Sequence, residues 1–216
     1  MRRWLRRLFG QETQRISEGE ASPTLLMADG FADHDIGELR WNPEHNRDLL
    51  TFTNDGRTAE WHSRQRAADE PQLAWVAAST CLRLHSGRFR WDFVVDEMAS
   101  RQIGIGFMLL WDIGPDWGFF GYLGASATAW AYDPSTGDVV SATNSIQGGL
   151  PKFKDGRTGI VSVEVTVPRH VQGSGRFIIA GTETNPIPLP SGAVVMPAAC
   201  FLKEMQKITL CNFKRL

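Results

Sequence analysis

Hydrophobic and polar residues alternate with a period of two along most of the chain, beginning near residue 38. In GRFRWDFVVD (87–96), large apolar side chains occupy every second position: Phe89, Trp91, Phe93 and Val95. Successive side chains of a β-strand point to opposite faces of the sheet, so this pattern predicts a strand with one buried and one mostly polar face. We therefore expect Trp91 to lie in the core beside Phe89 and Phe93, with Arg90 outside.

The same period recurs in GIVSVEVTV (159–167), where valines alternate with Ser162, Glu164 and Thr166. Further strand candidates are LLTFTNDG, RQIGIGFM, SATAWAY, GRFIIAG, AVVMPAACFL and QKITLCNF. Turn sequences separate the candidates: Asn54-Asp55-Gly56, DPSTGD (133–138), Asp155-Gly156 and Pro190-Ser191-Gly192. Many short strands without interleaved helices predict an all-β fold, an antiparallel two-sheet β-sandwich.

The N-terminal segment MRRWLRRLF is the exception, because its apolar residues follow a helical period. Trp4, Leu5, Leu8 and Phe9 share one helical face, and four arginines take the other. This pattern is typical of a basic amphipathic helix, which can lie on an anionic membrane surface. The residues that would contact such a surface are Arg2, Arg3, Trp4, Arg6, Arg7 and Phe9.

Two other interpretations of this segment stay open, because it is shorter than the ~12–15 residues that an isolated helix needs. It could be a frayed tail or a helix docked on the domain, or it could be an Arg-rich organelle transit peptide. The polar stretch QETQRISEGEASP (11–23) is typical of a linker. We predict a tail and linker over residues 1–23 and a single domain over residues 24–216.

The net charge of the 216-residue chain is −1, and its first ten residues carry four arginines and no acid. The remainder therefore carries −5, which argues against a nucleic-acid groove on the domain. No apolar run approaches the ~20 residues of a membrane span, and the start lacks the apolar core of a secretory signal. Cys81, Cys200 and Cys211 lack the spacing of a zinc site, so we expect core thiols in a reducing, cytoplasmic compartment.

Local signals for catalysis or metal binding are weak. Asp92 and Asp96 point to the same face of one strand, but their separation along it corresponds to roughly 13 Å. The carboxyl pairs of glycosidases lie ~5–9.5 Å apart, so an ordinary solvated strand face is the better interpretation. The histidines lack metal-ligand spacing, and the sequence contains no nucleophile elbow or phosphate-binding loop. We therefore expect a non-enzymatic chain that needs no metal or cofactor.

Several segments carry short motifs in a particular order along the chain. WNPEHNRDLLTFTNDGRTAEW (41–61) has the pattern of a strand pair, and HSGRFRWDFVVD (85–96), IGIGF (103–107) and LGASATAWAYDPSTGDVV (123–140) follow it. The last segments in the order are RTGIVSVEV, VVMPAACFL and ITLCNF. This order resembles the SPRY family, whose signature Ser-Gly-x-x-Tyr-Trp-Glu-Val is matched by Ser86, Gly87 and Trp91 and approached by Asp92.

The resemblance covers about residues 38–213. It is weakest at GRFIIAGTE (175–183), where the family has Asn-Gly at the end of a strand and this chain has Ala180-Gly181. It implies a concanavalin A-like jelly roll and, by family habit, a protein-binding module without catalysis. SPRY domains bind partners through loops at one edge of the sandwich, and those loops vary among members, so no contact residue is transferred.

The resemblance implies that WDIGPDWGFFGY (111–122) connects two strands. This segment contains five aromatic residues and three glycines. It is either a buried plug that caps the sandwich or a partly exposed surface that grips a partner, since Trp and Tyr are frequent interface anchors. The candidate partner-binding residues are Trp111, Asp112, Trp117 and Tyr122, whereas at least one of Phe119 and Phe120 is expected in the core. If the stretch is a plug, the binding site must lie in other loops, such as 62–72, 144–156 or 182–192.

The favoured function is a cytoplasmic adaptor domain that binds a peptide or loop of an unidentified protein, with residues 1–9 as a contact to a membrane surface. A carbohydrate-binding, lectin-like domain is a second interpretation, and a glycan hydrolase with a dispersed site is a third. The lack of a secretory signal weighs against the second, and the lack of paired carboxylates weighs against the third.

Overall fold

The computed structural model describes residues 38–44, 49–61, 75–97, 103–110, 123–153, 158–202 and 206–216, all within one compact unit, Asp35–Leu216. The N-terminal tail and the aromatic stretch 111–122 lie outside the described residues, as do Asp155-Gly156 and loop 62–72. The predicted division of the chain at residues 23 and 24 therefore stays a prediction.

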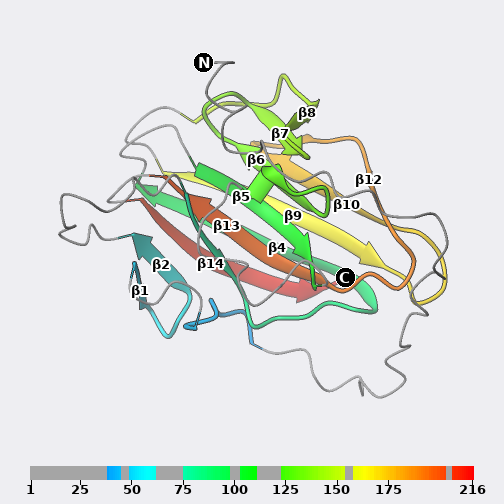
Figure 1. Ribbon diagram of the computed structural model, residues 1–216, viewed down its shortest axis with the longest axis horizontal. Coiled ribbons are helices and arrows are strands. Elements are labelled where there is room, and N and C mark those ends of the chain that lie inside the picture. Colours follow the sequence, from blue (N-terminus) through cyan, green and yellow to red (C-terminus); the bar gives the residue numbers. More distant parts are fainter. Residues whose placement is uncertain are drawn as a thin grey trace, which may run out of the picture. The chain divides into compact units, whose positions relative to one another are not determined.

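Two antiparallel sheets make up the described part of the chain (Figure 1). The eight-stranded sheet contains β1 (Leu50–Thr53), β2 (Thr58–Trp61), β4 (Gly87–Glu97), β9 (Gly159–Val167), β10 (Gly173–Ile179), β11 (Thr182–Glu183), β12 (Ile187–Leu189) and β14 (Lys207–Arg215). The six-stranded sheet contains β3 (Val76–Ser79), β5 (Ile103–Leu109), β6 (Ala129–Asp133), β7 (Asp138–Ser141), β8 (Asn144–Gln147) and β13 (Val195–Phe201). A short 3-10 helix, η3 (Leu123–Ala125), precedes β6.

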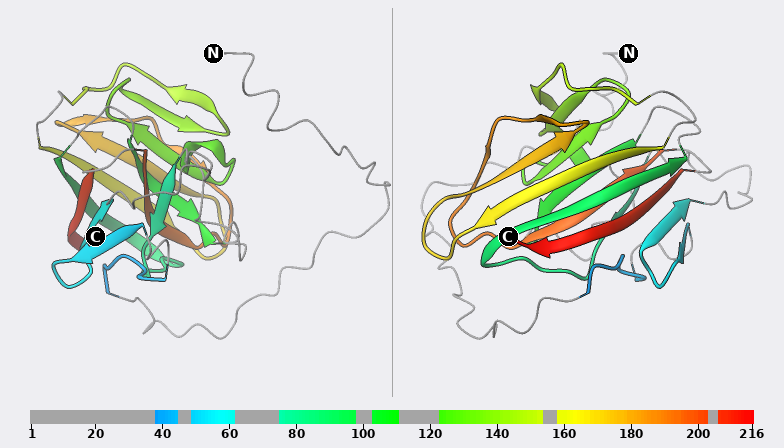
Figure 2. Two further views of the ribbon diagram at one scale, coloured as in Figure 1. Left: turned by 60° about the vertical axis from the view of Figure 1, so that its left-hand side comes forward. Right: turned by 180° about the vertical axis from the view of Figure 1, so that it is seen from behind.

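The strand order is β1-β2-β14-β4-β9-β10-β11 in the first sheet, where β12 also pairs with β10, and β3-β13-β5-β6-β7-β8 in the second. Strands that are distant in sequence lie side by side, such as β14 with β4 and β13 with β5 (Figure 2). The predicted all-β, two-sheet antiparallel sandwich is confirmed.

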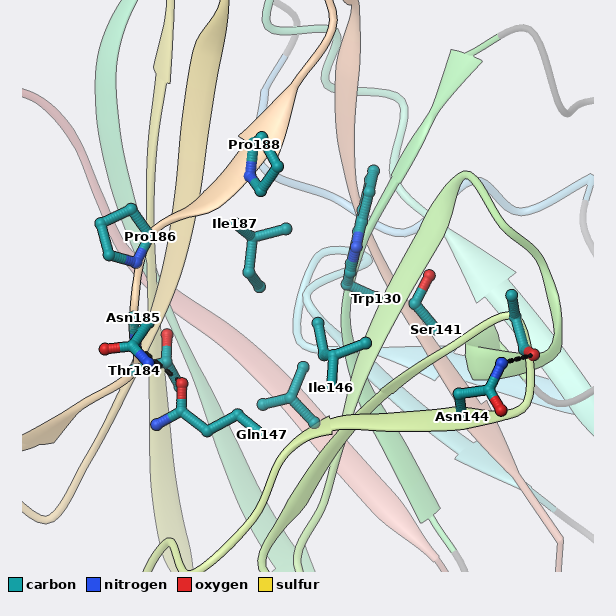
Figure 3. A pocket seen from close by; sticks show the side chains of 12 residues that line it. Trp130, Ser141, Asn144, Ile146, Gln147, Thr184, Asn185, Pro186, Ile187 and Pro188 are labelled. Carbon is teal, nitrogen blue, oxygen red and sulfur yellow. Dashed lines mark hydrogen bonds between the residues drawn. The ribbon is translucent and has the colours of Figure 1, made fainter.

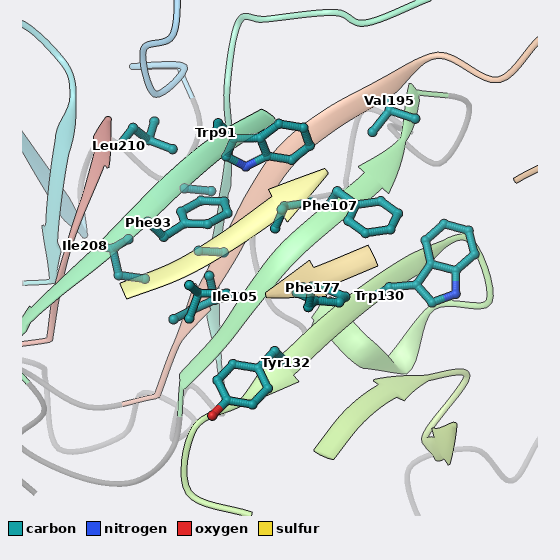
Figure 4. Packing of buried hydrophobic residues seen from close by; sticks show 14 of the residues in the cluster. Trp91, Phe93, Ile105, Phe107, Trp130, Tyr132, Phe177, Val195, Ile208 and Leu210 are labelled. Atoms are coloured by element: carbon teal, nitrogen blue, oxygen red, sulfur yellow. The ribbon is translucent and has the colours of Figure 1, made fainter. Parts of the chain in front are cut away.

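The core lies between the two sheets, and its large side chains come from both of them (Figure 4). Trp91, Phe89 and Phe93 are fully buried on β4, as the alternation predicted, and Trp91 lies opposite Val163 of β9 in the ladder. On the other sheet, the ring of Phe107 stacks against Trp130 at 5.2 Å and against Phe177 at 5.6 Å. These contacts tie β5 and β6 to β10 across the core.

The polar face of the eight-stranded sheet differs from the prediction. Asp92 is buried rather than solvated; Asn212 of the neighbouring β14 donates a hydrogen bond to its Oδ2 at 2.8 Å, and Nε of Arg90 lies 3.7 Å from its Oδ1. Asp96 accepts a hydrogen bond from the Thr209 hydroxyl at 2.6 Å. Each carboxylate is thus held by a partner on β14, and the interpretation of Asp92 as a solvated residue is wrong.

Glu164 is also buried on this face, because three arginines surround its carboxylate. Arg176 donates from Nε at 3.1 Å and from Nη2 at 2.6 Å, and Nη2 of Arg88 lies at 3.2 Å. Nη1 of Arg90 lies 3.5 Å from the second carboxylate oxygen. Burial alone would raise the pKa of Glu164, but the hydrogen bonds and charges of Arg176 and Arg88 outweigh it, so the pKa lies below its ordinary value.

The cysteines do not share one environment. Cys200 lies in the core, as predicted, and burial raises the pKa of its thiol to about 12. Cys81 is exposed and Cys211 is half-buried, so the prediction of core thiols is wrong for Cys81. Cys81 lies in a bend two residues beyond the end of β3, outside any strand.

The predicted turns form where their residues tolerate a positive φ. Asn54, Asp55 and Gly56 all have φ between 53° and 77° and connect β1 to β2. DPSTGD forms the β6–β7 hairpin, in which Oδ1 of Asp133 accepts hydrogen bonds from the amide and hydroxyl of Ser135. Ala180-Gly181 joins β10 to β11 with φ of 48° and 82°, as in a two-residue type I′ turn, so the alanine occupies a position that favours Asn or Gly.

Replacement of Trp91 by alanine should lower the free energy of unfolding by about 3–5 kcal/mol, because it opens a cavity between the sheets. Trp91→Phe should lower it less, because the ring is mostly retained and the indole N–H has no hydrogen-bond partner among the described residues. Urea denaturation measures both values. Ile160→Ala, at an exposed position of β9, is the control and should change stability by no more than about 0.5 kcal/mol.

Replacement of Ala180 by asparagine should raise the free energy of unfolding by about 0.5–1 kcal/mol, because asparagine tolerates the left-handed conformation better than alanine. The side chain is exposed, so no packing changes. Gly181→Ala should have the opposite sign, since φ is 82° there. A melting temperature of Ala180→Asn below that of the wild type would contradict the assigned turn geometry.

Replacement of Glu164 by glutamine should destabilise the fold by about 1–3 kcal/mol at pH 7, because the arginines lose a charged acceptor. The lowered pKa of Glu164 means that its stabilisation is complete above the pKa of the unfolded state, near ~4.3, and is lost as the pH falls through the folded-state pKa. The stability difference between wild type and Glu164→Gln, measured by urea denaturation, should therefore shrink below about pH 4. If the stability difference between wild type and Glu164→Gln did not change with pH, the lowered pKa of Glu164 would be contradicted.

Candidate functional site

A groove opens at one edge of the sandwich, where β8 of the six-stranded sheet faces the chain segment Thr184–Pro188 beside β10 (Figure 3). We call this segment the strap; it contains the start of β12. The cavity has a volume of about 460 Å³, within the range of ordinary ligand pockets. Trp130, Ile146 and Ile187 point toward one another across it in Figure 3. We call this cavity the edge groove.

The side of the edge groove that β8 forms is shaped by a tight hairpin. Ala142 and Thr143 join β7 to β8 with φ of 48° and 64°, and Ser141 pairs with Asn144 across the turn. Nδ2 of Asn144 donates to the carbonyl of Ala142 at 2.9 Å, which holds the turn. At the other end of the hairpin the β7–β8 ladder shifts register between Val139, which pairs with Gln147, and Val140, which pairs with Ser145, so Ile146 is the extra residue.

The opposite side is the strap, which alternates as an edge strand does. Ile187 is buried, whereas Pro186 and Pro188 are exposed. Proline has no N–H to donate, so it is suited to the edge of a sheet. The strap is anchored at Thr184, whose Oγ1 accepts a hydrogen bond from the amide of Phe177 at 3.0 Å.

One hydrogen bond connects the two sides: the amide of Asn185 donates to Oε1 of Gln147 at 2.8 Å (Figure 3). The inner end of the edge groove is the indole of Trp130, which is 8% exposed because its ring packs on Phe107. Ile146, near the mouth, is 47% exposed. The edge groove therefore offers an apolar surface within reach of solvent.

The described residues that line the edge groove carry no charge. They are apolar or hydroxyl residues, prolines and the amides Asn144, Gln147 and Asn185. Such a lining suits an apolar side chain, and the amides can hydrogen-bond to a peptide backbone at its rim. In addition, β8 is the last strand of its sheet and pairs with β7 alone among the described strands, so its outer edge can accept an added strand.

A second hollow lies on the other side of the strap, over the polar face of the eight-stranded sheet. Its lining includes Arg88, Arg176, Thr166 and Ser174, together with Pro186 of the strap. We call it the arginine hollow. Its volume is about 400 Å³, and Glu164 lies at its base. The described lining of the edge groove, by contrast, is uncharged.

The sequence-predicted site residues Trp111, Asp112, Trp117 and Tyr122 lie outside the described residues, as does the tail segment 1–9. Two of the alternative loops, 144–156 and 182–192, supply residues that line the edge groove. The first contains Ile146 and the second contains the strap. Trp130 was predicted only as part of a strand. The sequence did contain a signal that Ile146 could be an exposed binding residue, because it is the one large apolar residue in the polar stretch ATNSIQGG.

Within the described part of the chain, no group of three or more His, Cys, Asp or Glu side chains could hold a metal ion. None of the helices in that part is long and apolar enough to cross a membrane. The two carboxylates considered for glycoside hydrolysis, Asp92 and Asp96, are each hydrogen-bonded to a residue of β14. Both carboxylates thus take part in hydrogen bonds within the eight-stranded sheet.

No protein-family model matches this sequence, and no curated protein matches it either. Solved structures do match the fold. The SPRY domain of human HERC1 is 15% identical, with a TM-score of 0.55, and the match covers 80% of this chain and 97% of that domain. The PSpry domain of TRIM65 is 11% identical, with a TM-score of 0.56, and the match covers 81% of this chain and 89% of that one.

A further match is part of a longer protein. The stonustoxin structure is 16% identical, with a TM-score of 0.54 over 81% of this chain, but the match covers only 27% of the stonustoxin chain. At these identities the matches establish the fold, and they agree with the order of motifs from residue 41 to residue 213. The chain thus has the fold of the SPRY domains, in a divergent sequence.

Proposed function

We propose that this chain is a non-enzymatic protein-interaction module, and that its edge groove receives an apolar side chain from an extended segment of a partner protein. The observation that carries the proposal is the exposed Ile146 at the mouth of a neutral, apolar groove beside an edge strand. Domains that bind a peptide by strand addition hold its backbone with main-chain hydrogen bonds and take its alternate side chains into pockets.

The fold supports this proposal, since SPRY domains generally bind proteins through one edge of the sandwich. The proposal includes a cytoplasmic location and a membrane contact through residues 1–9, both of which rest on the sequence alone. The aromatic stretch 111–122 stays a second candidate for partner contact, with Trp111 and Trp117 as its anchors.

Sugar binding has less support from the described surface. A lectin that stacks a sugar ring needs an exposed aromatic face, and the large exposed apolar residues of the described chain are aliphatic: Ile146, Ile160, Val171 and Leu216. Trp130, the aromatic residue of the edge groove, has its ring packed against Phe107. A peptide side chain can reach the groove without an exposed ring.

Replacement of Ile146 by aspartate should weaken partner binding strongly with little loss of stability, because it places a charge in an uncharged groove at an exposed position. The probe is a library of random linear peptides displayed on phage and panned against the full chain. Affinity for the selected peptides should fall roughly thirtyfold or more, as for an interface hot spot. Calorimetry with the synthetic peptides measures it.

Ile160→Asp is the matched control, because Ile160 is 53% exposed and lies on β9, outside the lining of the edge groove. It should bind the selected peptides as the wild type does. Equal binding by Ile146→Asp and wild type would place the site elsewhere and defeat the proposal. Failure of the wild-type chain to enrich any peptide would also count against it.

A further inference from the structure

The strap separates two surfaces of different chemistry. On one side is the neutral edge groove, and on the other is the arginine hollow. Pro186 lines both of them, so only the thickness of one chain segment lies between the two. An extended peptide advances ~3.3 Å per residue, so a segment that crosses the strap can place two side chains about two or three residues apart in the two sites.

The arginine hollow has donors that its own carboxylate does not use. Arg88 reaches Glu164 through Nη2 alone, at 3.2 Å, and its side chain is 52% exposed. Arg176, by contrast, directs Nε and Nη2 to Glu164 and Nη1 to Glu183. Arg88 is therefore the cation best placed to accept another anionic partner.

The described lining of the hollow carries a net charge of +1. Its described lining contains Arg88 and Arg176 against the single acid Glu164, and Glu183 engages Arg176 from outside the lining. The hydroxyl residues Thr166 and Ser174 stand beside the arginines and can donate further hydrogen bonds. Guanidinium and hydroxyl donors together are the usual recognition set for a carboxylate.

We propose that the arginine hollow is a second subsite, which binds an acidic side chain of the same partner segment whose apolar side chain occupies the edge groove. The inference rests on the proposed function of the edge groove. The recognised partner is thus an extended peptide that carries a large apolar residue with an Asp or Glu within about two or three residues of it. Arg88 sets the preference for the acid, while Arg176 mainly holds Glu164 in place.

The test uses peptides selected on phage by the full wild-type chain. Asp or Glu should be enriched at a constant spacing from a large apolar residue. One selected peptide is then synthesised with its acid and with the matching amide, and both are titrated against wild type, Arg88→Gln and Arg40→Gln. Arg40, paired with Glu38 and 48% exposed, is the control because it lies outside both sites.

For the wild type and Arg40→Gln, the amide peptide should bind about three- to tenfold more weakly than the acid peptide, as expected for one partly exposed charged pair. For Arg88→Gln the two peptides should bind alike. Added salt should narrow the difference in the wild type, because exposed charges are screened.

The outcomes separate this inference from the function on which it rests. Selected peptides that lack an acid, yet lose binding to Ile146→Asp, would overturn the acidic subsite and leave the edge groove as the binding site. An acid preference that survives in Arg88→Gln would overturn the role of Arg88. If the wild type selects no peptide at all, both the subsite and the proposed function fall.

Discussion

The close approach of β5 and β10 is the contact on which the shape of the edge groove depends. The ring of Phe107 lies directly over Gly175, where an added Cβ would stand 2.5 Å from Cζ of the phenylalanine. Glycine therefore sets how near the two sheets come at this end of the sandwich. Phe107 in turn supports the indole of Trp130 at 5.2 Å, and that indole closes the inner end of the groove. A Cβ at position 175 would therefore require the Phe107 ring, on which Trp130 stacks, to shift.

Alternation along the strands predicted the all-β sandwich and the buried face of β4, whereas β5 and β13 are buried at every position and do not alternate. The register of β4 followed from the apolar positions on either side of Trp91, because burial of one face leaves a strand little choice of register. The turns at Asn54–Gly56 and at DPSTGD followed from residues whose side chains or backbone suit a turn. These features depend on residues that are close in sequence, so they can be predicted from one sequence alone.

The candidate site was much less predictable, because its parts come together only in the folded chain. Trp130 and Ile187 are far apart in sequence, and each has the pattern of an ordinary strand residue. The same holds for the buried Asp92, whose hydrogen-bond donor Asn212 lies on β14, far from it in sequence. Alternation predicts which way a side chain points, but it does not predict what covers the sheet face on the outside.

The short strand β8 has a further consequence, which concerns contacts between copies of the chain. An open sheet edge that accepts a partner strand can in principle also accept the same edge of another molecule. Here the edge strand has four residues, and a register shift breaks its ladder with β7. Across the groove, the strap has proline at two alternate positions, which supply no amide hydrogen. Both features limit the number of backbone hydrogen bonds that two copies could share, so edge-to-edge polymerisation is disfavoured. A short segment of another protein can still pair with the free edge of β8.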